Sequence, residues 1–267
     1  MKKTSLLILI ILSLNSFSKT IISTKSGNWN SINTWNTSTI PTNTDTVIIT
    51  NQDTININTN LARCDYLELD GTLFFKSNSN NLTSRIIYSK NKSEINGTSL
   101  AFLTVDDFIN NGTLSIGKIK LTVKKEFINN STLVFSSISG TKTFGQLINF
   151  GVINNKKNES LFIEKGLNNH GEINWDSAPI TFIKNGIITS KNLLNIETII
   201  FNDSLTISDS IRVSCINGSN LINRGYLDFS GKESSILIKK LIPIKPNTIV
   251  FSYHGSVSAP NFTNNNF

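Results

Sequence analysis

A short signature recurs along most of the chain, and it limits the possible folds more than any other feature. It consists of an apolar residue, one or two Asn or other polar residues, Gly or a close substitute, and then alternating apolar residues. The central residues of its copies are Gly71, Gly97, Gly112, Ser131, Gly151, Gly171, Gly186 and Gly225. From Gly97 to Gly186 the copies follow one another at steps of 15 to 20 residues. A period near 20 with strand-like alternation is typical of a solenoid, in which each coil contacts only its neighbours.

We therefore expect an all-β fold, a single-stranded parallel β-helix with loops of uneven length. Segments such as residues 117–123 alternate apolar and polar side chains, which turns one side of the strand inward. Asn and Gly tolerate a left-handed backbone, so the Asn-Gly pairs are expected to turn the corners. A pair of β-sandwiches built from hairpins is the alternative. The repetition of the signature favours the solenoid.

Composition supports this choice. The chain holds 38 Asn and 39 Ile but only 4 Ala, and Ala is the best helix former. A helical bundle is therefore excluded, and the chain lacks the regular amphipathic stretches of a doubly wound α/β fold. In a stacked solenoid we expect Ile in the inward rungs and Asn at the corners. There each Asn amide can hydrogen-bond the Asn of the coils above and below it.

Residues 1–18 have the three-part pattern of a secretory signal peptide. Lys2 and Lys3 precede the apolar run from Leu6 to Leu12, and Ser16 and Ser18 flank Phe17 before the predicted cut. The run is too short to span a bilayer, and no later segment is apolar enough to do so. A buried N-terminal helix or strand is the alternative. We expect a secreted or cell-surface protein with no transmembrane segment in the mature chain.

Residues 27–75 resemble the start of G8-like β-helix domains in secreted proteins, particularly surface and exported proteins of Bacteroidetes. The resemblance rests on Gly27-Asn28-Trp29, a second tryptophan at Trp35, and Ile40-Pro41 before the Asp45–Ile49 strand. It also rests on a leucine-rich strand that ends in Gly71-Thr72-Leu73. It implies a right-handed parallel β-helix. We divide the mature chain into a cap with the first coils at 19–75 and further coils at 76–267. The final segment, 261–267, is expected to be a weakly capped end of a truncated chain.

Trp29 and Trp35 are the candidate functional aromatics. The end of a solenoid exposes an apolar cross-section and unpaired strand edges, so these indoles are expected to cover the first coil. The alternative is a glycan-stacking platform made of the two rings.

Candidate catalytic and metal-binding groups are few. His170 lies in the signature and His254 near the end, and the carboxylates of Asp65, Glu68, Asp70, Asp106 and Asp107 are assigned to turns and surfaces. On a strand, Glu68 and Asp70 would face outward while Leu67 and Leu69 face inward. Zinc sites need three or four His, Cys or carboxylate ligands. We therefore expect no cofactor, no metal and no catalytic residue.

The two cysteines are expected to be free and buried. Cys64 and Cys215 are 151 residues apart, or about seven coils, which places them about 36 Å apart at the usual strand spacing. A disulfide requires Cα atoms within about 7 Å of one another.

The charge of the chain is mildly basic. The formal charge is +7, and removal of Lys2 and Lys3 leaves 23 − 18 = +5. The lysines are dispersed, whereas a nucleic-acid binder concentrates them beside aromatic residues, so we expect no nucleic-acid partner. Our first hypothesis is a non-enzymatic, monomeric surface protein with a structural, adhesive or matrix role. The alternative is a carbohydrate-binding or carbohydrate-active β-helix protein, with extracellular glycans or cell-surface proteins as partners.

Overall fold

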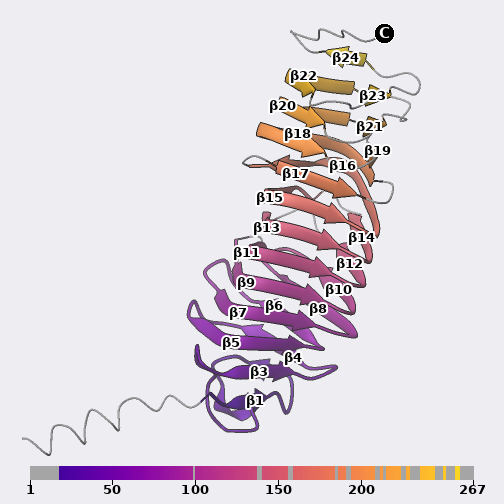
Figure 1. Cartoon of the computed structure of the whole chain (residues 1–267). Helices are drawn as coiled ribbons and strands as arrows, with labels where there is room; N and C mark the ends of the chain where they lie inside the picture. The colour runs from indigo at the N-terminus through magenta and orange to yellow at the C-terminus, as the bar shows by residue number, and fades with distance from the viewer. Residues whose placement is uncertain are drawn as a thin grey trace, which may run out of the picture.

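The computed structural model describes residues 18–98, 100–136, 140–155 and 159–183, and beyond these only the strands between residues 186 and 258. The strands stack along one axis from the N-terminal to the C-terminal end (Figure 1). The paired strands lie parallel, and each pairs with the equivalent strands of the coils before and after it. The predicted all-β parallel solenoid is confirmed.

Each central coil contains one long and one short strand. The long strands are β5 (Ala62–Leu69), β7 (Asn81–Ser89), β9 (Phe102–Asn110), β11 (Lys120–Asn129), β13 (Lys142–Asn149) and β15 (Leu161–Asn169). The short strands are β4 (Thr54–Ile57), β6 (Thr72–Phe75), β8 (Lys92–Gly97), β10 (Thr113–Ile116), β12 (Thr132–Phe135) and β14 (Val152–Asn155). The register shifts near the middle of the long strands, for example between Val123 and Glu126, so each contributes to two faces of the coil.

The first coil differs from the others. It contains β1 (Thr20–Ile22), β2 (Gly27–Asn28) and the 3-10 turn η1 (Ile32–Thr34), and β3 (Thr46–Ile49), which pairs with β1, begins the second coil. Strand pairing continues without a break across residue 75, because β5 pairs with β7 and β6 pairs with β8. The right-handed sense of the coils stays a prediction.

Toward the C-terminus the ladder continues through longer strands. They are β16 (Glu172–Phe182), β17 (Gly186–Ser190), β18 (Leu194–Ile207), β20 (Cys215–Asn223), β22 (Ser235–Pro243) and β24 (Ser256–Ser258). A second, smaller sheet consists of β19 (Ile211–Arg212), β21 (Leu227–Asp228) and β23 (Ile249–Val250). Residues 1–17, His254 and residues 261–267 lie outside the described part, and so does the side chain of Cys215.

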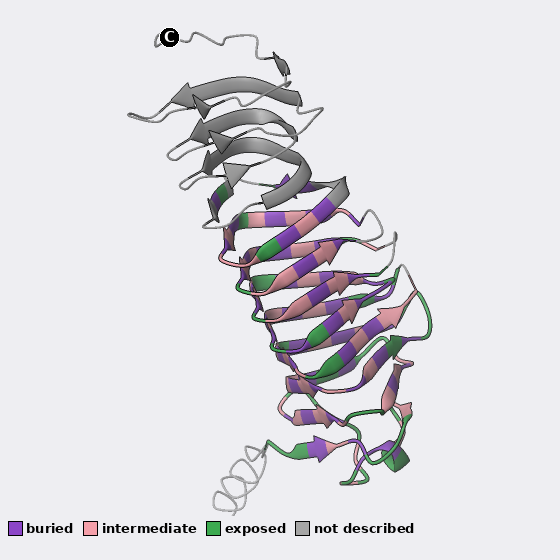
Figure 2. Ribbon diagram, turned by 90° about the vertical axis from the view of Figure 1, so that its right-hand side faces the viewer, coloured by how far each residue is buried: buried purple, intermediate pink, exposed green. Residues whose placement is uncertain are grey.

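The core is a continuous column of inward side chains. Buried and partly exposed residues alternate along the strands, which Figure 2 shows as colour bands. Phe127 stacks between Phe108 and Phe144, with ring centroids 4.8 and 4.7 Å away. The column therefore gains aromatic stacking in addition to the burial of apolar area.

The coil length is more regular than the sequence predicts. In the ladder Ser89 pairs with Asn110, which is followed by Asn129, Asn149 and Asn169 at separations of 21, 19, 20 and 20 residues. The spacing of the signature along the sequence is uneven because not every copy lies at the same corner. Asn96-Gly97 lies within β8, where it pairs with Phe74 and Phe75, and not at the corner that follows a long strand. Gly186 likewise opens β17. The coils are therefore more regular in length than the steps of the signature, although the corners between strands differ in length.

The predicted asparagine ladder is confirmed. Asn110, Asn129, Asn149 and Asn169 are fully buried at the ends of consecutive long strands. The Nδ2 of each of the first three donates to the Oδ1 of the next at 2.7 Å. These amides also bond backbone carbonyls of the turn, such as that of Val152. The ladder thus satisfies polar groups that the corner would otherwise bury without partners.

The glycines at these corners serve a different purpose from the predicted one. Of the described glycines, Gly140 alone has a positive φ, at 105°. At Gly112, Gly151 and Gly171 a Cβ atom would collide with backbone of the turn in the preceding coil. Glycine is needed here because consecutive turns stack too closely for a side chain.

Candidate binding surfaces

The two tryptophans pack against each other in the first coil. Trp29 is 1% exposed and Trp35 is 2% exposed, and their ring centroids lie 5.4 Å apart in an edge-to-face arrangement. The Trp35 Nε1 donates to the Trp29 carbonyl at 2.9 Å. Neither ring presents a face to solvent, so this arrangement does not favour the glycan-stacking alternative. The capping role stays a prediction.

An apolar row runs along the outer face formed by the second halves of the long strands. Ile109, Ile128 and Ile148 occupy the same register position in β9, β11 and β13, and each is partly exposed. Tyr88 of β7 precedes them in the same row. We call Ile109, Ile128 and Ile148 the isoleucine row. The expectation that Ile belongs to the inward rungs is wrong at these positions, because Phe108, Phe127 and Leu147 fill the core instead.

The sequence-predicted carboxylates are mostly engaged in surface ion pairs. Arg85 contacts Asp65 at 2.7 Å, Lys90 contacts Glu68 at 2.6 Å, and Lys124 contacts Asp106 at 3.3 Å. The pKa of Asp65 is lowered by its hydrogen bond with Arg85. Glu68 and Asp70 face outward beside buried Leu67 and Leu69, as predicted. Within the residues that the structure describes, no three or more His, Cys, Asp or Glu side chains gather so that they could hold a metal ion.

His170 lies at the corner after β15, as its place in the signature predicts. Its ring stacks on that of Phe150 from the previous coil, with centroids 4.9 Å apart and planes 8° from parallel. Phe150 is 53% exposed, so the pair forms an aromatic edge on the outside of the asparagine ladder.

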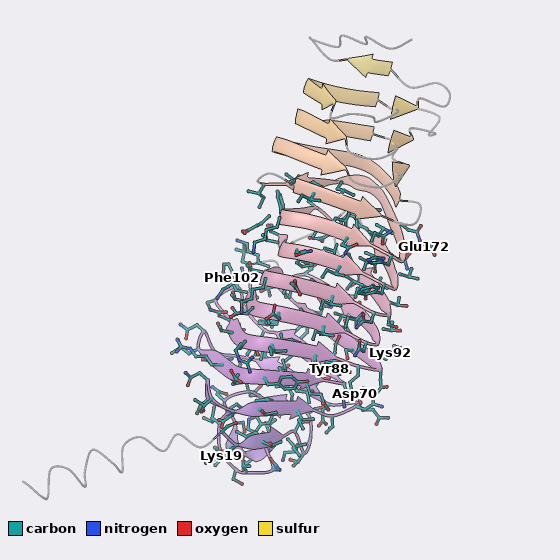
Figure 3. All side chains as sticks on the ribbon, in the orientation of Figure 1. Lys19, Asp70, Tyr88, Lys92, Phe102 and Glu172 are labelled. Carbon is teal, nitrogen blue, oxygen red and sulfur yellow. The ribbon has the colours of Figure 1, made fainter. Side chains whose placement is uncertain are left out.

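A polar groove crosses the face of the short strands near the N-terminal end. Its volume is about 380 Å³, and it is lined by Asn51, Gln52, Gly71, Thr72, Lys92, Ser93, Glu94, Thr113 and Ser115. Lys92, which lines the groove, and Asp70 lie along the same edge of the stack (Figure 3). The sequence interpretation missed this groove.

The groove exists because neighbouring corners differ in length. Residues 50–53 connect β3 to β4, whereas only residues 70–71 connect β5 to β6. In the next coil, residues 90–91 connect β7 to β8, and Thr72 pairs with Glu94, so Lys92 and Ser93 at the start of β8 extend beyond β6. The tight turn at 70–71 therefore lies between the wider turn at 50–53 and this two-residue extension of β8, and Gly71, which has no side chain, forms part of the floor. The extra residues in the corner at 50–53 and at the start of β8 were the available sequence signal.

A buried ion pair joins two neighbouring coils. The Lys142 Nζ donates to Glu159 Oε1 at 3.1 Å and to the Ile119 and Gly140 carbonyls at 2.9 and 3.2 Å. The two side chains are 0% and 3% exposed. Burial lowers the pKa of Lys142 and raises the pKa of Glu159. Nothing in the residue pattern predicted this pair, because only the stacking of the coils brings the two residues together.

Cys64 is free and buried, which confirms one half of the cysteine prediction. Its Sγ lies 3.5 Å from the Ser84 hydroxyl. Burial raises the pKa of the thiol to about 12. A thiol in this environment behaves as a small apolar group.

Comparison with known protein families identifies part of the stack. Residues 34–152 match the family model described as G8 domain. This part of the chain is similar to G8 domains. The match begins within residues 27–75 and continues beyond them, from the end of η1 to the start of β14. It thus includes the groove and the isoleucine row.

No curated protein and no solved structure matches the chain. Among the described residues, no helix is both long and apolar enough to cross a lipid bilayer.

Proposed function

We propose that this G8-domain protein is exported and acts at the cell surface as a non-enzymatic β-solenoid with an adhesive or structural role. The observation that carries the proposal is the isoleucine row. A partly exposed apolar side chain at the same place in consecutive coils forms an extended surface, and such patches are typical of interaction sites. The partner is a glycan or a protein of the cell surface.

The contact between Lys19 and Asp45 supports export. Lys19 is the residue that follows the predicted cut, and its backbone nitrogen lies 3.0 Å from Asp45 Oδ1. Cleavage after Ser18 would turn this nitrogen into a charged α-ammonium group beside a buried carboxylate. The new ion pair would hold β1 against the coil that contains β3. Amino-terminal sequencing of protein recovered outside the producing cells should begin at Lys19.

An adhesion assay tests the role of the isoleucine row. Beads coated with the mature chain are expected to bind intact cells of the producing organism. The variant Ile109→Thr, Ile128→Thr, Ile148→Thr should lose this binding while it still folds, because Thr keeps the β-branched shape. The matched control changes Thr104, Thr122 and Thr143 to Val, since these residues face outward from the first halves of the same strands. Equal binding by the Ile variant and the wild type would contradict the adhesive role.

A second candidate function, carbohydrate binding, is favoured by the polar groove. Its lining is rich in amide, hydroxyl and charged side chains, which are the groups that hydrogen-bond sugars. Turnover of a polysaccharide by the purified protein would contradict the non-enzymatic proposal.

A further inference from the structure

The polar groove presents side chains whose hydrogen-bonding capacity the protein does not use. In the part of the chain that the structure describes, the Gln52 amide and the Lys92 ammonium group have no hydrogen-bond or ion-pair partner. Gln52 lies in the wide corner at residues 50–53, and Lys92 is the first residue of β8, on the opposite side of the tight turn at residues 70–71. Donors on both walls can therefore reach a ligand that lies over Gly71 and Thr72.

The backbone fixes the shape of the groove. Gln52 in the wide corner at residues 50–53 and Asn91 in the corner that leads into β8 have positive φ values of 71° and 48°. Non-glycine residues in this region are uncommon and are tolerated where the surrounding structure holds them. The Thr72 amide donates to the Asp53 carbonyl at 2.8 Å, and the Glu94 amide donates to the Gly71 carbonyl at 3.1 Å. These bonds hold the floor against both walls, so the site is formed before any ligand arrives.

Size and charge together indicate the class of ligand. A volume of about 380 Å³ lies within the range of small-molecule sites, roughly 300–1,000 Å³. The lining contains one cation, Lys92, and one anion, Glu94, so it favours neither charge. Asn51 and Gln52 offer both donors and acceptors, and Thr72, Thr113 and Ser115 offer hydroxyl groups. A neutral ligand with several hydroxyl groups satisfies such a set.

We propose that this groove is a binding site for a neutral sugar residue of an extracellular polysaccharide, held between the corner at residues 50–53 and the start of β8 at Lys92. The inference rests on the second candidate function and assigns it a location. Gln52 and Lys92 supply hydrogen bonds from opposite walls, and Thr72 lies beneath the sugar.

Binding to immobilised polysaccharides tests the site. The mature full-length chain is applied to mannan, laminarin and xylan as neutral probes and to alginate as an acidic probe. We expect binding to at least one neutral probe. The variant Gln52→Gly, Lys92→Ala should weaken it at least about tenfold, since the loss of two hydrogen bonds is worth that factor or more. Glycine at residue 52 keeps the positive φ accessible.

A matched pair of filling variants separates the groove from the rest of the face. Thr72→Tyr should block binding, whereas Thr132→Tyr should leave it unchanged. Thr132 is the first residue of β12, as Thr72 is of β6, and it pairs with Thr113 but does not line the groove. Thermal unfolding confirms that both variants are folded.

Each contrary outcome has a distinct meaning. Binding to a neutral probe that survives all groove variants would overturn the assigned site and leave carbohydrate binding in place. Binding to alginate alone would overturn the neutral class of ligand. Failure to bind any probe would overturn both the groove and the second candidate function, while the adhesive role is judged by the bead assay.

Discussion

At the residue scale, the buried asparagines do more than turn corners. Each amide in the ladder accepts one hydrogen bond from the coil before it and donates to the coil after it. Because the donor and the acceptor are on the same side chain, the pattern can continue through any number of coils. Ser89 begins the series by donating to Asn110 Oδ1 at 2.8 Å. Removal of a middle member breaks bonds on both sides.

The first prediction concerns this middle member. Asn129→Ala should reduce the free energy of unfolding by roughly 2–4 kcal/mol, because Asn110 and Asn149 are left with buried unpaired groups. Asn130→Ala is the control, since that exposed side chain makes one bond, to Asn111 Oδ1. Urea unfolding measures both. A loss in Asn129→Ala no larger than that in Asn130→Ala would show that the ladder contributes little.

The second prediction concerns the pH dependence of stability. Burial raises the pKa of Glu159 above its ordinary value of 4.5. At a pH between 4.5 and the raised pKa, the Glu159 carboxyl therefore keeps its proton in the folded protein and loses it in the unfolded chain. The contribution of Glu159 to stability is therefore greatest below pH 4.5 and falls as the pH rises through the raised pKa. The Glu159→Gln variant lacks this contribution. Urea unfolding across this window should show the wild type losing stability relative to the variant. Parallel pH profiles would contradict the shift.

At the element scale, the corner is the part of the coil that sets the spacing. The two-residue corners 111–112, 130–131 and 150–151 stack directly on one another, and their backbones approach closely. The wide corner at residues 50–53 and the two extra residues at the start of β8 interrupt this pattern and create the groove. Corner length thus decides whether the face of the short strands is flat or hollowed.

The third prediction tests the close approach of the corners. Gly151→Ala should reduce the free energy of unfolding by more than about 2 kcal/mol, because the new Cβ would meet the Ser131 carbonyl. The cause is steric, since Gly151 does not have a positive φ. The matched control is Ser131→Gly, at the same corner position one coil earlier, and it should cost much less. Thermal unfolding of the two variants provides the comparison, and equal effects would argue against the collision.

At the scale of the whole molecule, a solenoid has one core but two ends. Each inner coil is covered by its neighbours, whereas the first coil must cover its own lower side. The edge-to-face pair of Trp29 and Trp35 lies in that coil and is almost completely buried. Removal of both tryptophan side chains should therefore destabilise the stack, beginning with the first coil at its N-terminal end.

The fourth prediction is that the double variant Trp29→Ala, Trp35→Ala fails to fold. Each buried tryptophan is worth about 3–5 kcal/mol, and the stability of a whole domain is only about 5–15 kcal/mol. Circular dichroism and proteolysis of the mature chain measure the outcome. A double variant that folds normally and only loses a ligand would contradict the capping role and restore the glycan-stacking alternative.

The fifth prediction concerns the cysteines. Eight strand-to-strand steps separate β5, which carries Cys64, from β20, which begins at Cys215. At about 4.8 Å a step, the two strands lie about 38 Å apart, so no intramolecular disulfide should form. A non-reducing gel that showed such a bond would contradict this register. With a pKa of about 12, Cys64 should react with thiol reagents only after unfolding.

Several features could be predicted from the sequence because they depend on local pattern. Alternation along residues 117–123 gave the strand and its inward side, and the signature at Asn110, Asn129 and Asn149 gave the ladder. The place of Ile could not be predicted in the same way. In Phe108-Ile109 and Phe127-Ile128 both residues are apolar, and only the register shows that Phe is inside and Ile outside.

The sequence by itself determined the all-β class, the coil period near 20 residues and the asparagine corners, because these follow from the chemistry of residues close together in the chain. The tertiary structure decided the rest. The Lys142–Glu159 pair, the stacking of Gly151 on Ser131 and the groove over Gly71 each join different coils. Such contacts depend on the length of every corner between them, because a change in the length of one corner alters which residues of neighbouring coils meet.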